Sequence, residues 1–471
     1  MSKQRLFILV GITLFLSGCS LAPEYTRPEA PIPADWSRTA VDRKPAASNG
    51  TPVSAVPQLK WQEFFTDERL QKIIDIALKN NRDLRLAALN VERARALYGI
   101  QRAGLFPVVN AVGIGSKERV PADLSSTGNA RISEKYAVNL GITSWEIDFF
   151  GRIRSLKERA LEAYLATDQA RSSAQISLMS SVAQAFLVLA ADRESLSLVQ
   201  FAFETRQAAY DLIRRRSEVG LATELDLRRA QTLVDAARGE LARYTQQVVK
   251  DENALNLLLG TPLPDTLLPA DVSDIAHPRE ISPGIGSEVL LLRPDILQAE
   301  HQLKGAYANI GAARAAFFPR ISLTSAVGTA SADLSGLFSS GSATWSFVPQ
   351  ISIPIFDART WSAYRVTKVD REIAVAQYEK AIQTAFKEVA DTLAERSTVG
   401  QRIAAQESLV DAVADTYRLS NKRYIKGIDS YLSVLDAQRS LYAAQQELVA
   451  LRLAKLVNQV KLFAVLGGGV E

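Results

Sequence analysis

Two regions of the chain, at about 106–150 and 318–356, alternate apolar residues with small or polar ones. In the first region, one alternating segment runs from Val108 and a second runs from Tyr136, with a polar stretch between them. Because successive side chains of a strand point to opposite faces, a period of two predicts strands. Each region is therefore predicted to be a β-hairpin with one apolar face and one face of small or polar residues.

Outside these regions the apolar residues follow helical spacing. The stretch from Gly151 to about Glu218 contains no proline and no further glycine. At a rise of 1.5 Å per residue, a helix of that length would be about 100 Å long. A second helix is predicted from about Thr223 to Leu259, with apolar residues mostly at the three-four spacing of a coiled coil.

The same order of elements occurs twice. GLATELDLRRAQ begins at Gly220 and GIDSYLSVLDAQ begins at Gly427, an offset of 427 − 220 = 207 residues. Duplication of one unit explains this pattern most simply. We predict two tandem repeats, at 61–270 and 287–471, joined by a linker at 271–286.

Each repeat is also predicted to contain a hairpin of two long antiparallel helices, with its turn near 220 or 427. The glycine of each turn provides the stop signal of the first helix. Thr223 in one repeat and Ser430 in the other provide an N-cap oxygen for the second helix.

Composition narrows the function more than it specifies it. The 471 residues are 47% hydrophobic and 23% charged, with a formal net charge of +4, which fits a folded chain and gives no argument for nucleic-acid binding. The basic triplet at 214–216 is interpreted as a solvated helix end facing the C-terminal dipole. With one cysteine and two histidines, a zinc site or a catalytic triad is not expected, and His277 and His301 are assigned to the surface. We therefore do not expect an enzyme or a bound metal.

The N-terminus has the pattern of a lipoprotein signal. Two basic residues precede the apolar run at 6–16, and small residues follow it up to Cys19. This pattern resembles the bacterial lipobox and implies a signal peptide at 1–18, with diacylglycerol and an N-acyl chain such as palmitate on Cys19. Ser20 implies sorting to the outer membrane. The proline-rich segment 19–60 is predicted to be an extended strap from this anchor.

The apolar faces of the two hairpins need a partner. Four strands cannot close a barrel, and in lipid every backbone polar group must be paired, so the strands must close with those of other chains. Two chains would give eight strands and a filled barrel, whereas three would give twelve strands and a lumen. Small inner residues would help to keep that lumen open: Gly113, Gly115, Gly141 and Gly328.

Several motifs together resemble a known family. They are the lipobox, the Phe-Pro pairs that begin the hairpins, Trp-Glu-Ile-Asp-Phe-Phe-Gly at 145–151, Ala-Ala-Phe-Phe-Pro at 315–319 and Tyr-Leu-Ser-Val-Leu-Asp-Ala-Gln-Arg at 431–439. They closely resemble the TolC-like outer-membrane factors, and most of all the OprM-type lipoproteins of tripartite multidrug efflux pumps. The resemblance covers essentially the whole chain.

This resemblance implies a mostly α fold with transmembrane β strands. The chain would form a homotrimer with a twelve-stranded outer-membrane barrel and a long periplasmic coiled-coil α-barrel. The implied function is a passive, gated exit duct for drugs in the outer membrane of a Gram-negative bacterium. The implied partners are a periplasmic adaptor (membrane fusion) protein, an inner-membrane RND transporter and outer-membrane lipid.

The resemblance also assigns a periplasmic gate to the second tip. Leu432, Asp436 and Arg439 are spaced four and three residues apart and share a helix face. In a threefold ring, Leu432 would form an apolar constriction and Asp436 a carboxylate ring that could attract a cation. Ser433 stands where some relatives carry a second carboxylate, so cation binding is expected to be weaker here.

The family's closed state is latched by a tyrosine and an aspartate on different hairpins, and the matching residues are Tyr424 and Asp226. Taken alone, these residues could equally be a packed helix-end aromatic and a solvated first-turn acid. The family's adaptor docks at the tips, where the spacing Arg-x-x-x-Gly occurs twice. The implied docking residues are Arg216, Gly220, Thr223, Arg423, Gly427 and Ser430.

Two alternatives to drug efflux stay open at this stage. A tube of the same fold could be an outer-membrane duct for protein secretion. A coiled-coil envelope scaffold without a pore would belong to another class, and the four alternating strands argue against it.

Overall fold

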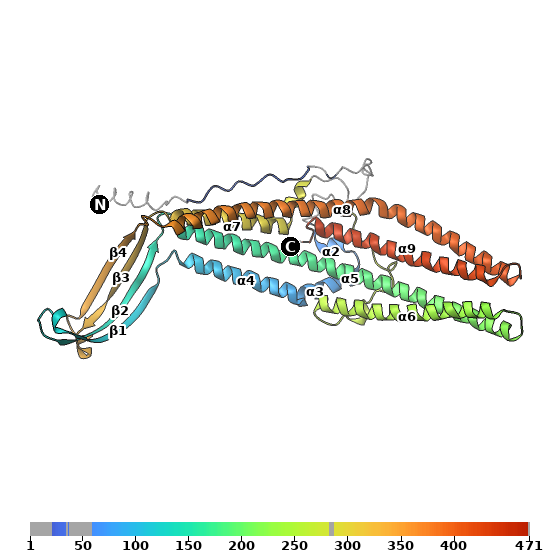
Figure 1. Cartoon of the computed structure of the whole chain (residues 1–471), viewed down its shortest axis with the longest axis horizontal. Coiled ribbons are helices and arrows are strands. Elements are labelled where there is room, and N and C mark those ends of the chain that lie inside the picture. The colour runs from blue at the N-terminus through green and yellow to red at the C-terminus, as the bar shows by residue number, and fades with distance from the viewer. Residues whose placement is uncertain (1–20, 34–35, 37–58, 282–286, 470–471) are drawn as a thin grey trace. The chain divides into compact units, whose positions relative to one another are not determined.

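The computed structural model describes residues 21–33, 36, 59–281 and 287–469 (Figure 1). Cys19, the predicted signal peptide, and parts of the predicted strap and linker lie outside the described residues. The chain folds into two compact units. The first comprises 1–29, 90–167 and 298–378, and the second comprises 30–89, 168–297 and 379–471.

The same order of helices and strands occurs twice along the chain, as the repeat predicts. The α-helices are α2 (Trp61–Phe64), α3 (Glu68–Asn80), α4 (Arg82–Ala103), α5 (Arg152–Glu218), α6 (Glu224–Leu259), α7 (Pro294–Ala315), α8 (Ala358–Ile425) and α9 (Tyr431–Val465). The strands are β1 (Val109–Val120), β2 (Arg131–Ile147), β3 (Arg320–Ser331) and β4 (Ala343–Ser352). Both hairpins lie within the ranges expected from the alternating pattern.

The first unit contains one antiparallel sheet in the order β1-β2-β3-β4 (Figure 1). The two hairpins therefore pair with each other through β2 and β3. Their register shifts between Ile142 and Trp145, where Ser144 has a φ of +52° and its N–H donates to Thr324 Oγ1 at 3.2 Å. Such an irregularity bends a strand and increases its twist.

Two of the sheet glycines have a different role from the one expected. A Cβ on Gly141 would lie 2.5 Å from the carbonyl oxygen of Ser325, and one on Gly328 would meet the carbonyl of Val138. A Cβ on Gly113 would meet nothing within 4 Å. Gly141 and Gly328 are thus required by the close approach of β2 and β3 and not mainly by the width of a lumen.

The sheet exposes apolar side chains and two open edges. Nearly every residue of β1 and β4 is exposed, including Ile114 at 51% and Trp345 at 78%. Strands β1 and β4 each pair with one neighbour, so a row of backbone N–H and C=O groups is unpaired on each. In water such edges promote association, and in lipid they must be closed.

The described part of the strap is held against α7 in the first unit. Arg27 Nη2 lies 2.6 Å from Glu300 Oε2, and the Tyr25 hydroxyl donates to Glu300 Oε1 at 3.1 Å. Burial acts to raise the pKa of Glu300, but hydrogen bonds from Arg27 and Lys304 bring that pKa below its ordinary value. The strap is therefore fixed by a charged carboxylate.

His301 does not lie free at the surface as the sequence suggested. Its Nδ1 lies 2.6 Å from Glu162 Oε2, and both side chains are largely buried in the first unit. The ring packs between α5 and α7, so its polar tip needs a partner. His277 is exposed, as expected.

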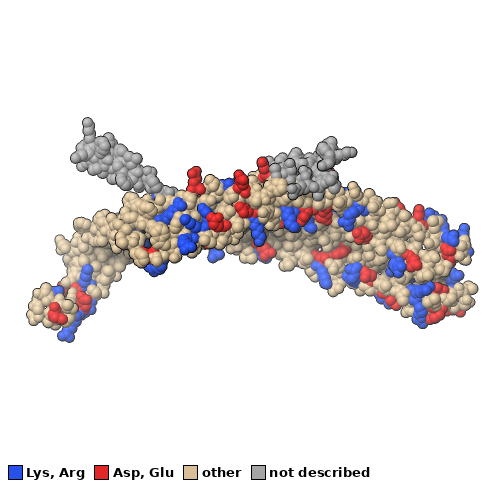
Figure 2. Space-filling model, turned by 45° about the horizontal axis from the view of Figure 1, so that its top comes forward, with Lys and Arg blue, Asp and Glu red and all other residues tan. Residues whose placement is uncertain are grey.

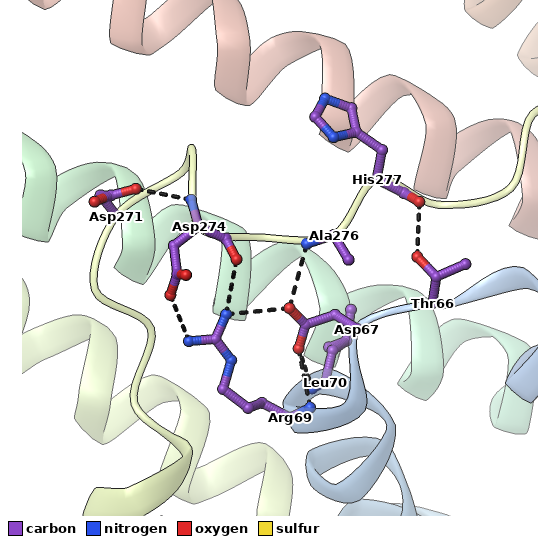
Figure 3. A network of polar contacts seen from close by, with 8 residues as sticks. All are labelled: Thr66, Asp67, Arg69, Leu70, Asp271, Asp274, Ala276 and His277. Carbon is purple, nitrogen blue, oxygen red and sulfur yellow. Dashed lines mark hydrogen bonds and ion pairs between the residues drawn. The ribbon is translucent and has the colours of Figure 1, made fainter.

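In the second unit, a polar network joins the start of α3 to the segment after α6 (Figure 3). Asp67 is the N-cap of α3 and accepts hydrogen bonds from the N–H groups of Arg69 at 2.9 Å and Leu70 at 3.0 Å. It also accepts from the N–H of Ala276 at 3.3 Å, while Arg69 Nη1 donates to Asp274 Oδ2 at 2.6 Å. Burial acts to raise the pKa of Asp67, but hydrogen bonds from the Arg69 guanidinium and from the N–H groups of Leu70 and Ala276 lower it below its ordinary value.

Replacing Asp67 with alanine is expected to lower the free energy of unfolding by about 1–3 kcal/mol, because buried N–H groups lose their acceptor. The lowered pKa means that this stability is present above the ordinary aspartate pKa and is lost as pH falls through the folded value. Chemical denaturation of wild type and variant measures the difference. Asp75→Ala is the matched control, since Asp75 is half exposed and pairs with Lys79 on the same helix. Equal effects of the two substitutions would contradict this role for Asp67.

Candidate gate at the tips of the helical hairpins

Both helical hairpins of the second unit end in turns of the same backbone form. Gly220 has a φ of +76°, and the N–H that follows it donates to the carbonyl of Arg216 at 2.7 Å. Gly427 has a φ of +71°, and the N–H that follows it donates to the carbonyl of Arg423 at 3.0 Å. The glycine of the repeated Arg-x-x-x-Gly spacing therefore has a structural cause, because a left-handed residue ends each helix.

The second helices of the hairpins begin differently. Thr223 caps α6 as predicted: its hydroxyl accepts from the N–H of Asp226 at 3.1 Å, and its own N–H donates to the Asp226 carboxylate at 3.4 Å. Ser430 occupies the N-cap of α9, but its side chain makes no cap hydrogen bond. The prediction that Ser430 supplies a cap oxygen is therefore wrong. Ser433, three residues on, offers no carboxylate to complete a reciprocal pair.

Arg216 joins the two hairpins. Its Nη1 donates to the Tyr424 hydroxyl at 2.8 Å, and its guanidinium carbon lies 5.4 Å from the centroid of the Tyr424 ring. Both side chains are half-buried. The interpretation of the basic triplet as a solvated helix end is therefore wrong for Arg216, because a tyrosine 208 residues away holds its side chain.

The resemblance pairs Tyr424 with Asp226, and the structure gives each of them another partner. The Asp226 carboxylate accepts from the Thr223 hydroxyl at 2.7 Å as part of the α6 cap. Among the hydrogen bonds of the described residues, none joins Tyr424 to Asp226. A latch at Tyr424 thus has a structural partner in Arg216, and its pairing with Asp226 stays a prediction.

The three predicted gate residues lie in the first turns of α9. Leu432 is 40% exposed, so this apolar side chain lies open in a single chain. Arg439 Nη2 donates to Asp436 Oδ1 at 3.3 Å, three residues apart on one helix face. An exposed pair of this kind contributes little stability, but it reduces the charge that Asp436 offers to a cation.

The second turn is braced by an ion pair. Arg423 donates from Nε and Nη2 to the two carboxylate oxygens of Asp429 at 2.6 and 3.0 Å. The hydrogen bond from Arg423 lowers the pKa of Asp429, so the pair stays charged at neutral pH. Arg423 is therefore engaged within the turn, and since its side chain is 55% exposed, its role in docking stays a prediction.

An aromatic pair lies behind the Arg216–Tyr424 contact. The rings of Tyr424 and Tyr431 are 5.0 Å apart, and burial raises the pKa of Tyr431 to about 12. Farther from the turns, the guanidinium carbon of Arg206 lies 5.4 Å from the centroid of the Tyr442 ring. Gln446 Nε2 also donates to the Tyr244 hydroxyl at 3.2 Å. The contacts between hairpins therefore use neutral aromatic and amide groups as well as arginines.

The tips carry charges of both signs. On the face drawn in Figure 2, Lys and Arg alternate with Asp and Glu over the ends of the hairpins. Exposed apolar residues lie among them, including Val219, Leu221 and Ile425. In the part of the chain that the structure describes, no group of three or more His, Cys, Asp or Glu is placed to hold a metal ion.

Comparison with known proteins supplies a family for this arrangement. The family described as "Outer membrane efflux protein" matches residues 73–261 and 285–468. The first segment contains β1, β2 and the α5–α6 hairpin, and the second contains β3, β4 and the α8–α9 hairpin. The chain belongs to this family. The two matched segments of this efflux protein correspond to its two repeats.

Relatives of the efflux protein match along nearly the whole chain. The antibiotic efflux pump outer membrane protein ArpC of Pseudomonas putida is 48% identical over 100% of this chain and 96% of its own length. The solvent efflux pump outer membrane protein SrpC of Pseudomonas putida is 46% identical over 97% of this chain and 96% of its own length. The open state of the MtrE outer membrane channel of Neisseria gonorrhoeae has a TM-score of 0.86 at 37% identity, over 96% of this chain and 99% of that chain. The resemblance to TolC-like channels is thereby confirmed.

Proposed function

We propose that this efflux protein is the exit duct of an RND-type tripartite multidrug pump, working as a homotrimer in the outer membrane. The single observation that carries the proposal is the four-stranded apolar sheet with both edges open. Three copies would supply twelve strands, satisfy every edge and enclose a lumen. Drugs would pass without catalysis, because the duct only connects compartments.

A lipid on Cys19 would anchor the first unit, which contains the sheet. Leu21, two residues after Cys19, accepts a hydrogen bond from Arg314 at 3.1 Å through its carbonyl. Two residues of chain span at most about 7 Å. Arg314 lies near the end of α7, six residues before β3 begins at Arg320, so a diacylglycerol and N-acyl chain on Cys19 would enter lipid beside the barrel.

The helical tips would form the periplasmic entrance. Leu432 and Asp436 of three copies would narrow it, and the Arg216–Tyr424 contact would hold the α8–α9 hairpin against the α5–α6 hairpin. A periplasmic adaptor protein would meet the exposed apolar residues of the turns, with an inner-membrane RND transporter as the source of energy. A cation at the Asp436 ring would compete with Arg439.

Relatives named for antibiotic and solvent efflux favour drug export over protein secretion. The test uses a strain that lacks its own outer-membrane channels and receives this chain with its adaptor and transporter. Restored tolerance to antibiotics and toluene, with no restored protein secretion, is the expected result. Restored secretion without drug tolerance would contradict the proposal and favour the secretion duct.

A further inference from the structure

Two aspartates face each other between the arms of the first helical hairpin. Asp192 lies on α5, 218 − 192 = 26 residues before its end, and Asp251 lies on α6, 251 − 224 = 27 residues after its start. At 1.5 Å per residue, both are about 40 Å from the turn. The two carboxyl groups interact, since a hydrogen bond with Asp251 is among the causes that raise the pKa of Asp192.

Asp251 is buried and short of donors, and Asp192 is half-buried. Asp251 is 9% exposed; its Oδ1 accepts from Gln247 Nε2 at 2.9 Å, and its Oδ2 has no hydrogen-bond donor in the described part of the chain. Two ionised carboxylates in contact repel and lose hydration, whereas a shared proton turns the repulsion into a hydrogen bond. Oδ2 of Asp251 is thus placed to accept a proton held by Asp192.

The surroundings of Asp192 favour retention of that proton. Burial is the main cause that raises the pKa of Asp192, the hydrogen bond and charge of Asp251 raise it further, and together they bring it to about 7. Among charged groups Arg243 opposes this shift, and its guanidinium is already paired with Glu240 at 2.7 Å. The carboxyl of Asp192 therefore exchanges its proton close to neutral pH.

The second repeat provides an internal comparison. Gly260 after α6 and Gly467 after α9 both have positive φ, at +67° and +77°, so the offset of 467 − 260 = 207 holds along these helices. The residue equivalent to Asp251 is then Asn458, which is 1% exposed. Its Nδ2 donates to the carbonyl of Thr392 at 2.9 Å and to Glu395 Oε2 at 3.1 Å. The second hairpin thus joins its arms with an amide and a carboxylate, and this packing does not need two acids.

We propose that Asp192 and Asp251 share one proton and form a pH-sensitive clasp between the two arms of the α5–α6 hairpin. With the proton present, a hydrogen bond links the arms. When it is lost, two adjacent carboxylates repel inside the hairpin, and the arms loosen locally. The α8–α9 hairpin, with Asn458 in place of the second acid, has no such response.

The direction of the pH dependence follows from linkage. The folded pKa of Asp192 is raised above its ordinary value of 3.8 to about 7. The stabilisation is fully present when the pH lies below the ordinary aspartate pKa. It is lost progressively as the pH rises toward the pKa of Asp192 in the folded protein, and it changes no further above that pKa. The clasp is therefore closed in acid and open in weakly alkaline conditions.

Hydrogen exchange of the purified full-length protein, corrected for the intrinsic effect of pH, tests the clasp. Between pH 5 and pH 8, wild type is expected to lose protection in peptides around 192 and 251 by at least about tenfold, the effect of a single unit of pKa shift. Asp251→Asn, which copies the second repeat, is expected to keep the same protection at both pH values. Peptides around 399 and 458, the positions equivalent to 192 and 251 at the offset of 207, serve as the control within the same molecule.

Asp235→Asn is the matched control variant, because Asp235 is an exposed acid of α6 that pairs with Arg238. It is expected to behave as wild type. Equal pH responses of wild type and Asp251→Asn would overturn the proposal. If that variant does not fold, infrared titration of wild type decides: the carbonyl band of a protonated carboxyl should disappear with a midpoint near pH 7, and its absence at pH 6 would overturn the shared proton.

Discussion

Replacing Gly141 with valine is expected to prevent the protein from assembling in the outer membrane. A Cβ at this position would lie 2.5 Å from the carbonyl oxygen of Ser325 and 2.9 Å from the Cα of Ala326. These are backbone atoms of β3, so the clash can be relieved only by separating β2 from β3. These two strands join the hairpins, and their separation would leave four unpaired edges per chain instead of two.

The measurement is the amount of folded protein recovered from the outer membrane, with Gly113→Val as the matched control. Gly113 pairs with Val138 across β1 and β2, and a Cβ there meets nothing within 4 Å. The control is expected to assemble close to the wild-type level, and Gly141→Val below a tenth of it. Comparable recovery of both variants would show that the close approach of β2 and β3 is not needed.

The combined substitution Arg216→Ala with Tyr424→Phe is expected to raise the open fraction of single channels in planar bilayers by roughly tenfold to a hundredfold. A hydrogen bond to a charged group contributes about 1.5–3 kcal/mol, and each 1.4 kcal/mol is a factor of ten in an equilibrium. The change removes the one hydrogen bond between these residues and the ring contact of the guanidinium. The α8–α9 hairpin then loses this contact with the α5–α6 hairpin at the tip.

Arg215→Ala is the matched control for this prediction. It removes the same charge from the neighbouring residue, whose side chain is exposed, and is expected to leave the open fraction unchanged. Asp226→Ala distinguishes a latch between Tyr424 and Arg216 from a latch between Tyr424 and Asp226. If Asp226→Ala opens the channel and Arg216→Ala does not, the pair implied by the family resemblance is the latch and the Arg216 contact is not.

Patterns with a local cause could be predicted from the sequence. Alternation placed the hairpins within the ranges that contain β1–β2 and β3–β4, because a strand's side-chain period is set by the backbone. Gly220 and Gly427 marked the turns because a left-handed helix end favours glycine. The repeat offset then related the two halves to each other.

Contacts between distant segments could not be predicted in the same way. Arg216 and Tyr424 are 208 residues apart, and a basic triplet at a helix end is equally suited to solvent. His301 has no sequence signal for Glu162, which lies on another helix. Asp192 and Asp251 were missed for the same reason, although the comparison with Asn458 was available once the offset of 207 was known.

The start of α9 shows that residue type alone does not predict a helix cap. Thr223 and Ser430 are equivalent by the repeat, yet only Thr223 has an aspartate three residues on to complete the pair. Gly141 and Gly328 show a similar limit, since small residues suit both a lumen and a close strand approach. In both cases the neighbouring segment decides the role.

Closure of one barrel by three chains through β1 and β4 can be tested by cysteine cross-linking of these two edges. A cysteine replaces Val112 on β1, and a second cysteine is moved one residue at a time along β4. Cys19 is the chain's sole natural cysteine and is the predicted lipid site, so it should not interfere. At the positions that react, denaturing gels are predicted to show a ladder that ends at three chains. A ladder that continues beyond three chains, or no cross-link at any position in membrane-inserted protein, would contradict closure of the barrel by three chains.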